Sequence, residues 1–249
     1  MFRILPLLSS LFLFSINASA QFSDSIKNYV NFASSGSINK TEDGSAYLLN
    51  NSFQFKVKKE RIESNLSGSW VYGKQNQQLS NNDFSAALDF NIYHRKASNL
   101  YYWGLANYNT SYSLKINNQL LTGIGLAYNL INKENQKLNI SDGILFDRSD
   151  LILADETNEI YSTLRNSFRL TFKFTIYKII TLQNTSFIQN SLSYKDDYII
   201  KTNSSIGFKL TNWLSFDTRY DYNQISRTKR ENHLLSYGLK LEKYFWLPI

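Results

Sequence analysis

The sequence predicts an all-β protein, a closed antiparallel transmembrane β-barrel of about 12 strands preceded by a cleaved signal peptide. First, apolar and polar residues alternate one by one over long stretches, as in SFRLTFKFTI at 167–176, and this period of two is typical of a strand between two different environments. Second, most such segments span 12 to 14 residues, whereas strands in soluble proteins average about 5–6 residues. Third, long and short connections alternate, as they do in outer-membrane barrels.

The first 20 residues read as a signal peptide. Arg3 gives a short positive start, residues 4–14 are an apolar run, and Ala18-Ser19-Ala20 is a small-residue cleavage site. We therefore expect residues 1–20 to be removed and residues 21–249 to form one outer-membrane β-barrel domain. The corresponding location is the outer membrane of a Gram-negative bacterium.

The alternation divides the rest of the chain into twelve segments. An even number returns the last strand to the periplasmic side, where the first strand begins. The segment 29–38 has the weakest pattern, and both faces of 100–112 are mixed. The clearer strands are expected at 45–58, 61–73, 83–95, 119–132, 137–149, 159–176, 181–194, 198–210, 214–225 and 233–246.

The connections carry the expected sidedness. The longer ones are the first, third, fifth, seventh and eleventh, including NKTEDG, KQNQQLSNN and SRTKREN. The even-numbered ones have at most four residues, and the ninth, KDD, is a short exception. Long extracellular loops and short periplasmic turns are typical of bacterial barrels.

Composition excludes several classes of protein. A mean hydropathy of −0.35 argues against a helical membrane protein, and the absence of Cys excludes a disulfide framework, a thiolate metal site and a Cys-anchored lipoprotein. The net charge of +7 could suit nucleic acid, but an exported protein seldom meets it, so we expect no nucleic-acid partner. The sequence contains no cluster or motif for a metal or cofactor, and we expect none.

Three stretches resemble one known family. They are LLTGIGLAYNLINKENQKLNISDGILFDRSD at 120–150, RNSFRLTFKF at 165–174, and KLTNWLSFDTRYDYN followed by LLSYGLKLEKYF near the end. The chain resembles the family of salt-induced outer membrane proteins, an uncharacterised family of outer-membrane β-barrels. The resemblance implies an outer-membrane location and a link to salt or osmotic stress, and it supplies no catalytic residues. This chain lacks the Pro that the family often has in the last outer loop.

Charged residues on the polar faces are expected to line the lumen. They form either a ring that sets the selectivity of a solute path or a packed network of salt bridges that plugs the barrel. If the path is open, the four cations of the main set should favour small anions, because that set includes only two acids. The main set is Arg165, Arg169, Lys173, Asp217, Arg219 and Asp221, and the same parity adds Glu63, Asp89, Lys201, Lys209, Lys240 and Glu242.

Aromatic residues near strand ends are expected at the membrane interfaces. They are Tyr72, Tyr93, Tyr101, Trp213, Phe245 and Trp246. The connection SRTKRE at 226–231 offers Arg227, Lys229 and Arg230 either to lipopolysaccharide or simply to solvent.

We expect no enzymatic activity. An outer-membrane phospholipase with twelve strands is known, but such chemistry needs a nucleophile activated by His. His94 and His233 are the only histidines, and neither has a nucleophile two residues away on the same strand face.

The predicted function is that of a structural or stress-related outer-membrane barrel, or of a narrow porin-like channel for small solutes. The alternatives are an outer-membrane lipid-modifying enzyme and a soluble exported ligand-binding β-barrel. The expected partners are outer-membrane lipid, lipopolysaccharide and the barrel-assembly machinery, and the barrel is expected to be a monomer.

Overall fold

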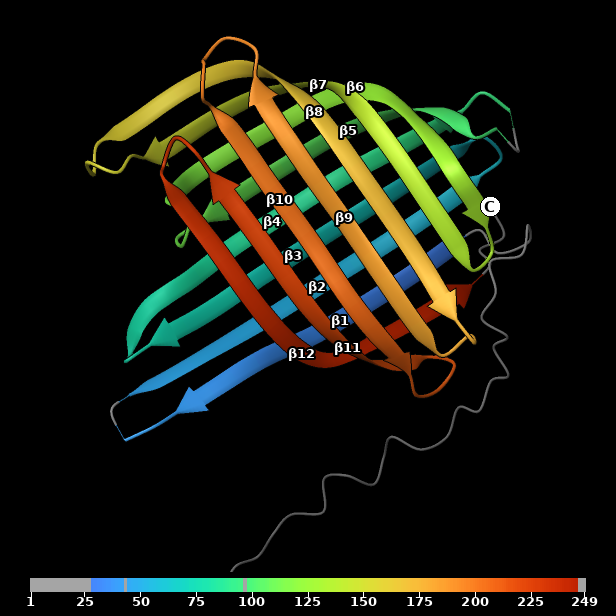
Figure 1. The fold of residues 1–249 in the computed structure, drawn as a ribbon, viewed down its shortest axis with the longest axis horizontal. Coiled ribbons are helices and arrows are strands. Elements are labelled where there is room, and N and C mark those ends of the chain that lie inside the picture. Colours follow the sequence, from blue (N-terminus) through green and yellow to red (C-terminus); the bar gives the residue numbers. More distant parts are fainter. Residues whose placement is uncertain (1–27, 43, 96–97, 246–249) are drawn as a thin grey trace, which may run out of the picture.

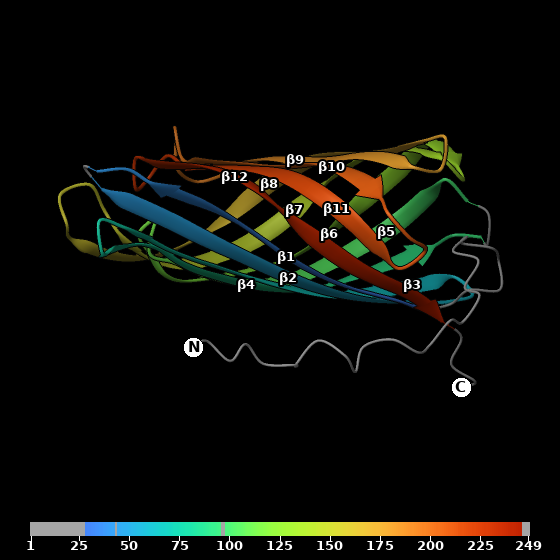
Figure 2. The ribbon, with the colours of Figure 1, turned by 90° about the horizontal axis from the view of Figure 1, so that it is seen from below.

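A computed structural model of the chain describes residues 28–42, 44–95 and 98–245. These residues form twelve antiparallel strands that close into one barrel, and each strand runs obliquely across it (Figures 1 and 2). No described helix is long and apolar enough to cross a membrane. The strands are β1 (Asn28–Lys40), β2 (Ser45–Lys59), β3 (Ile62–Gln75), β4 (Gln78–Tyr93), β5 (Leu100–Ser111), β6 (Ile116–Lys133), β7 (Gln136–Ile152), β8 (Asn158–Ile176), β9 (Ile180–Ser191), β10 (Tyr198–Lys209), β11 (Leu214–Ile225) and β12 (Arg230–Phe245).

The first and last strands close the barrel. β1 pairs with β12 from Asn28↔Phe245 to Gly36↔Tyr237, and every other strand pairs with its neighbours in sequence. The start of β1 and the end of β12 therefore lie at one end of the barrel, which we call the terminal mouth. The opposite end, where β1 turns into β2, is the distal mouth. The predicted closed barrel with twelve strands is confirmed, and the expected leader lies outside the described residues.

The expected alternation of connection lengths is wrong. KQNQQLSNN forms only a two-residue turn, Asn76–Gln77, and residues 78–82 belong to β4. Both turn residues have positive φ, 49° and 65°, as a tight type I′ hairpin requires. The ninth connection is longer than expected and spans residues 192–197. Polar residues mark the end of the apolar band of a strand, but their backbones can still form strand pairs beyond it. The sequence prediction treated these polar residues as turns and therefore placed the turns wrongly.

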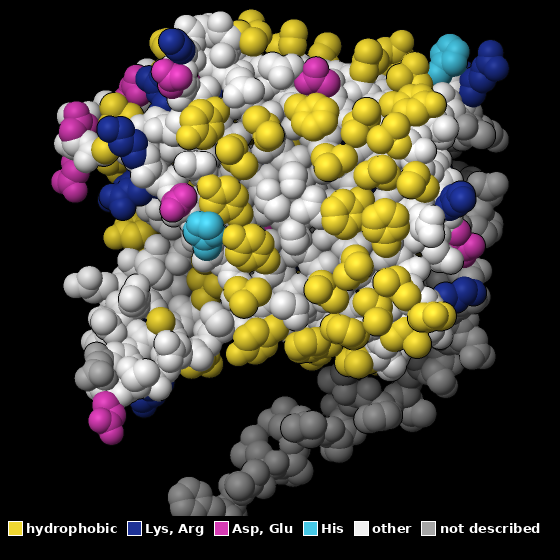
Figure 3. All heavy atoms as spheres, viewed as in Figure 1, with side chains coloured by type: hydrophobic (Ala, Val, Ile, Leu, Met, Phe, Trp, Pro, Cys, Tyr) yellow, Lys and Arg dark blue, Asp and Glu magenta, His cyan; other side chains and the backbone are white. Residues whose placement is uncertain are grey.

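The two faces of the wall differ as the alternation predicts. On β8 the outward Ile160 and Leu164 are 70% and 47% exposed, whereas the inward Arg165 is 0% exposed. In Figure 3 apolar side chains cover most of the visible outer wall, and most charged side chains lie toward its two ends. One large surface is therefore apolar, and polar groups are enclosed within the barrel.

Two of the aromatic assignments are wrong. Tyr93 and Tyr101 face one another inside the barrel, with ring centroids 4.8 Å apart, and Tyr101 is only 6% exposed. Because the two are direct cross-strand partners, both side chains share one face. Trp213, in the connection between β10 and β11, is 56% exposed, while Trp246 lies outside the described residues.

Candidate functional site

An apolar cluster lies inside the barrel near the distal mouth, and we call it the plug. Its side chains come from five strands and one connection, and each is at most 7% exposed. Ile116 and Leu151 are cross-strand partners on β6 and β7, and Ile199 and Ile225 are partners on β10 and β11, so the cluster packs together side chains from one arc of the inner wall. The plug consists of Leu114, Ile116, Leu151, Tyr161, Ile199 and Ile225.

A buried ion cluster adjoins the plug and is centred on Arg165 of β8. Its Nε donates to Asp147 Oδ2 at 2.6 Å, and its Nη2 donates to Asp197 Oδ1 at 2.9 Å. The side chains of Arg165 and Asp147 are both 0% exposed. Nη2 also donates to Tyr161 Oη at 2.6 Å, which ties the ions to the plug. A buried arginine needs such partners, because an uncompensated charge in a protein interior is costly.

Arg227, in the connection between β11 and β12, reaches across the distal mouth to β8. Its guanidinium pairs with Glu159 and lies 4.1 Å from the ring centroid of Tyr161 and 4.9 Å from that of Tyr194. Its Nη1 is 3.7 Å from Asp197. The alternatives of lipopolysaccharide contact or plain solvation do not describe this residue, because its side chain is only 17% exposed. The connection thus folds over the plug.

Polar side chains also bond between strands that are not neighbours in the wall. Asn50 Nδ2 on β2 donates to Asp221 Oδ2 on β11 at 3.3 Å, and Arg219 Nη1 donates to Ser52 Oγ at 3.3 Å. β1 and β12 separate β2 from β11 in the wall. These bonds therefore pass over two intervening strands inside the barrel, and the arrangement matches the packed-network alternative better than a hydrated ring.

Arg169 lies inside the barrel over the Trp103 ring. Its Cζ lies 5.6 Å from the indole centroid, and its Nε donates to Ser141 Oγ at 3.0 Å. The indole lies against the inner wall at Gly125 and Gly143, where an added Cβ would be 2.5 Å from Trp103 Cζ2. Glycine is needed at these two positions because the ring and backbone atoms of the facing strand occupy the space of a side chain.

The terminal half of the lumen contains the remaining residues of the predicted set. Asp217 Oδ2 lies 3.6 Å from Lys240 Nζ, and the same amine lies 3.5 Å from Glu242 Oε2. Lys173 is the direct cross-strand partner of Lys137. The six predicted residues do not meet at one point, because Arg165 is in the distal cluster and Lys173 is near the terminal mouth.

Sequence reasoning missed the acids that neutralise Arg165. Asp147 has the inward parity of β7, together with Leu145 and Ser149, so that parity could have found it. Asp197 lies in the connection between β9 and β10, where no alternation exists to place a side chain. Because Asp147 and Asp197 neutralise it, Arg165 is not a free cation of the lumen wall. The excess of cations over acids that the sequence predicted is therefore smaller in this part of the lumen.

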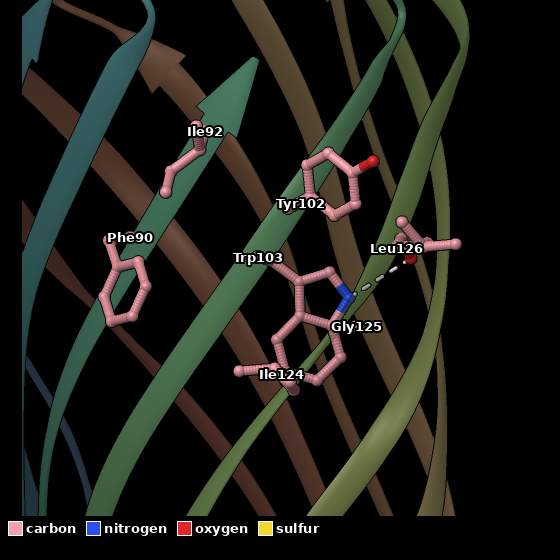
Figure 4. A pocket seen from close by; sticks show the side chains of 7 residues that line it. All are labelled: Phe90, Ile92, Tyr102, Trp103, Ile124, Gly125 and Leu126. Atoms are coloured by element: carbon pink, nitrogen blue, oxygen red, sulfur yellow. Dashed lines mark hydrogen bonds between the residues drawn. The ribbon is translucent and has the colours of Figure 1, made fainter. Parts of the chain in front are cut away.

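A separate apolar cavity of about 390 Å³ opens on the wall at β4, β5 and β6. In Figure 4 the Trp103 Nε1 donates to the carbonyl oxygen of Leu126, at 3.2 Å, so the ring is held at this wall. The cavity offers hydrophobic contact but almost no polar group for chemistry. Its lining is Phe90, Ile92, Tyr102, Trp103, Ile124, Gly125 and Leu126. Among the described residues, no group of three or more His, Cys, Asp or Glu could hold a metal ion.

Residues 48–239 match the model of the family described as "Protein of unknown function, DUF481". The chain belongs to this family. The match covers nine complete strands, β3 to β11, together with most of β2 and all of β12 except its last six residues. No curated protein is similar enough in sequence to match the chain.

Solved outer-membrane barrels share the fold. The NanC porin has 10% sequence identity and a TM-score of 0.51, over 87% of this chain and all of that one. An outer membrane channel from Pseudomonas putida F1 has 9% identity and a TM-score of 0.51, over 92% and 100% of the two chains. The translocator domain of the autotransporter NalP from Neisseria meningitidis has 12% identity and a TM-score of 0.50, over 89% and 90%. At these identities the likeness concerns the fold alone.

Proposed function

We propose that this member of the family is an outer-membrane barrel whose lumen is closed at rest, with a structural or stress-related role rather than that of an open pore. The observation that carries the proposal is Arg165, which is 0% exposed and bonded to two carboxylates beneath the plug. An open aqueous path through this level would leave the guanidinium in contact with water.

The energetics support a closed resting state. Opening the lumen at this level would separate Arg165 from its two carboxylates and would break these charge-assisted hydrogen bonds. Displacement of the plug adds to this cost, because its apolar side chains would be exposed to water.

The outward face supports the membrane location. Strands of 12 to 19 residues exceed the roughly 9–11 that cross the hydrocarbon region at a tilt, and full closure leaves no strand edge unpaired. In this proposal residues 1–20 are the signal for export, and the rest of the chain inserts into the outer membrane of a Gram-negative bacterium. There it is assembled by the barrel-assembly machinery as a monomer among lipid and lipopolysaccharide.

We also propose that the barrel is not an enzyme. His233 lies on the outward face of β12, where its Nδ1 is 2.8 Å from the Tyr220 hydroxyl. His94 follows β4 at the terminal mouth, near the opposite end of the barrel. Such catalysis needs a nucleophile within reach of a histidine in a space that holds the substrate, and neither histidine has this arrangement.

Cell fractionation with a heat-modifiability gel tests the membrane part, and swelling of proteoliposomes in isotonic sugar tests the closed lumen. The expected result is a heat-modifiable outer-membrane band and no swelling. A soluble periplasmic protein would overturn the location. Swelling at a porin-like rate, from protein with a fully shifted band, would overturn the closed lumen and favour the narrow channel.

A further inference from the structure

We propose that the outer wall of the barrel binds one lipid whose acyl chain carries a hydroxyl group next to its polar end. The polar part of the site is a row of three outward side chains, Asp142 on β7, Asn166 on β8 and Asn190 on β9, which we call the wall track. The site rests on the proposed membrane location, because only there does this face meet lipid, and it does not involve the lumen.

The wall track interrupts an otherwise apolar part of the outer face. Each of its three residues has an apolar residue two positions away on both sides along the chain, and five of these six neighbours are 43–59% exposed. Asp142 is exposed as well, so it places a carboxyl group within the lipid-facing band, where an unsatisfied polar group is costly. The six neighbours are Ile140, Ile144, Leu164, Phe168, Ile188 and Leu192.

The three side chains form a continuous polar row. Asn166 Nδ2 donates to Asp142 Oδ1 at 2.8 Å, and Asn166 and Asn190 are direct cross-strand partners. Within the described part of the chain, Asn166 is the one side chain that bonds to the Asp142 carboxylate, which has room for about four hydrogen bonds. A cation is costly at this depth, so the donor that fits the remaining acceptor sites is a neutral hydroxyl.

An apolar groove continues the wall track toward the terminal mouth. Asp142 is itself part of the lining of a groove of about 190 Å³, together with Phe168, Tyr128 and Leu100. Leu100 begins β5 and Tyr128 lies near the end of β6, so the groove extends toward the terminal mouth. Leu126 lines both this groove and the cavity shown in Figure 4, so the two hollows adjoin. Together they offer an apolar channel on the outer wall for a hydrocarbon chain.

The order of polar and apolar parts selects the occupant. Asn190 is the last residue but one of β9, so the wall track begins near the distal mouth and the groove follows it. A lipid of the distal leaflet would place its polar end at Asn190 and Asn166, its hydroxyl at Asp142 and its chain in the groove. A second barrel presents a convex wall, which cannot fill the groove as a flexible chain can.

The test is a competition between two lipids on the full-length folded protein, measured by native mass spectrometry from neutral detergent. One lipid is glucosamine acylated on its amine with a hydroxymyristoyl chain, and the other has a plain myristoyl chain in its place. Asp142→Leu removes the acceptor and keeps the face apolar. Asp150→Leu is the matched control, because Asp150 is also an outward acid of β7 that accepts amide hydrogen bonds, from Asn117 and Asn118, but it lies near the distal end of the strand.

The wild type and Asp150→Leu are expected to hold the hydroxylated lipid in at least about tenfold excess over the plain one, because one hydrogen bond to a carboxylate gives a factor of this size. Asp142→Leu should bind both lipids without preference. Equal occupancy or no bound lipid in the wild type, or a preference that survives in Asp142→Leu, would overturn the site. A dimer that Asp142→Leu abolishes would also overturn it, because a second copy would then cover the wall track. Each protein is first shown to have a heat-modifiable band, so failure of the site is distinct from failure of the membrane location.

Discussion

Replacing Arg165 by Met tests the buried ion cluster most sharply. Arg165 makes two carboxylate contacts at 2.6 and 2.9 Å, and the three side chains are at most 2% exposed. Removal of the guanidinium leaves Asp147 without its cation and leaves Asp197 with only the more distant Arg227, at 3.7 Å. Breaking a buried pair in this way costs about 3–5 kcal/mol, so we expect a loss of that size in the free energy of unfolding.

The assay is equilibrium unfolding by denaturant in lipid vesicles at neutral pH. Arg148→Met is the matched control on β7, where the side chain has outward parity and is exposed. It should change stability by no more than about 0.5 kcal/mol, as surface substitutions usually do. In the double variant Arg165→Met with Asp147→Asn, the total loss should be smaller than the sum of the two single losses, because the partners are coupled. A loss below about 1 kcal/mol for Arg165→Met would refute the account of the cluster.

Three other substitutions extend the test. Phe172→Arg should cost about 2–4 kcal/mol of folding free energy in vesicles, because it places a cation on the lipid face near the midplane. The inward Thr171→Arg should cost less. If Thr171→Arg costs more, the assignment of the two faces is inverted. Gly125→Val should destabilise the folded barrel by about 1–3 kcal/mol through overpacking against the indole, measured by the same unfolding assay, and an unchanged midpoint would show that the ring is free to move. Arg227→Ala should release the distal connection and give intermittent conductance with anion preference, since the remaining lumen has excess cations; cation preference under a salt gradient would refute that charge argument.

The period-two pattern was sufficient to predict the barrel, because each residue of a closed wall meets one of only two environments. On β8 the alternation from Phe168 to Ile176 specified both faces without any long-range information. The same reasoning fails at strand ends, where side chains of either kind can continue a hairpin. That is why the turn at Asn76–Gln77 and the length of the ninth connection were misjudged.

The contents of the lumen were less predictable. Parity places Arg165, Arg169 and Lys173 inside, but it does not give the register between strands. The register sets Arg165 opposite Leu145 and therefore diagonal to Asp147. Asp197 and Arg227 belong to connections, and they reach β8 only because the barrel closes in three dimensions. Whether the network is packed or hydrated depends on those contacts, and the pattern of one strand does not contain them. The link to salt stress that the resemblance implies stays a prediction.

Planar-bilayer recording of the purified, folded wild-type protein tests the closed lumen most directly. Folding is established beforehand by the heat-modifiable band, and insertion by recovery of the protein in the membrane fraction. The account predicts no steady conductance steps in molar potassium chloride at moderate voltage, because the plug and the Arg165 cluster block the path. Regular, long-lived steps from the wild type would contradict it.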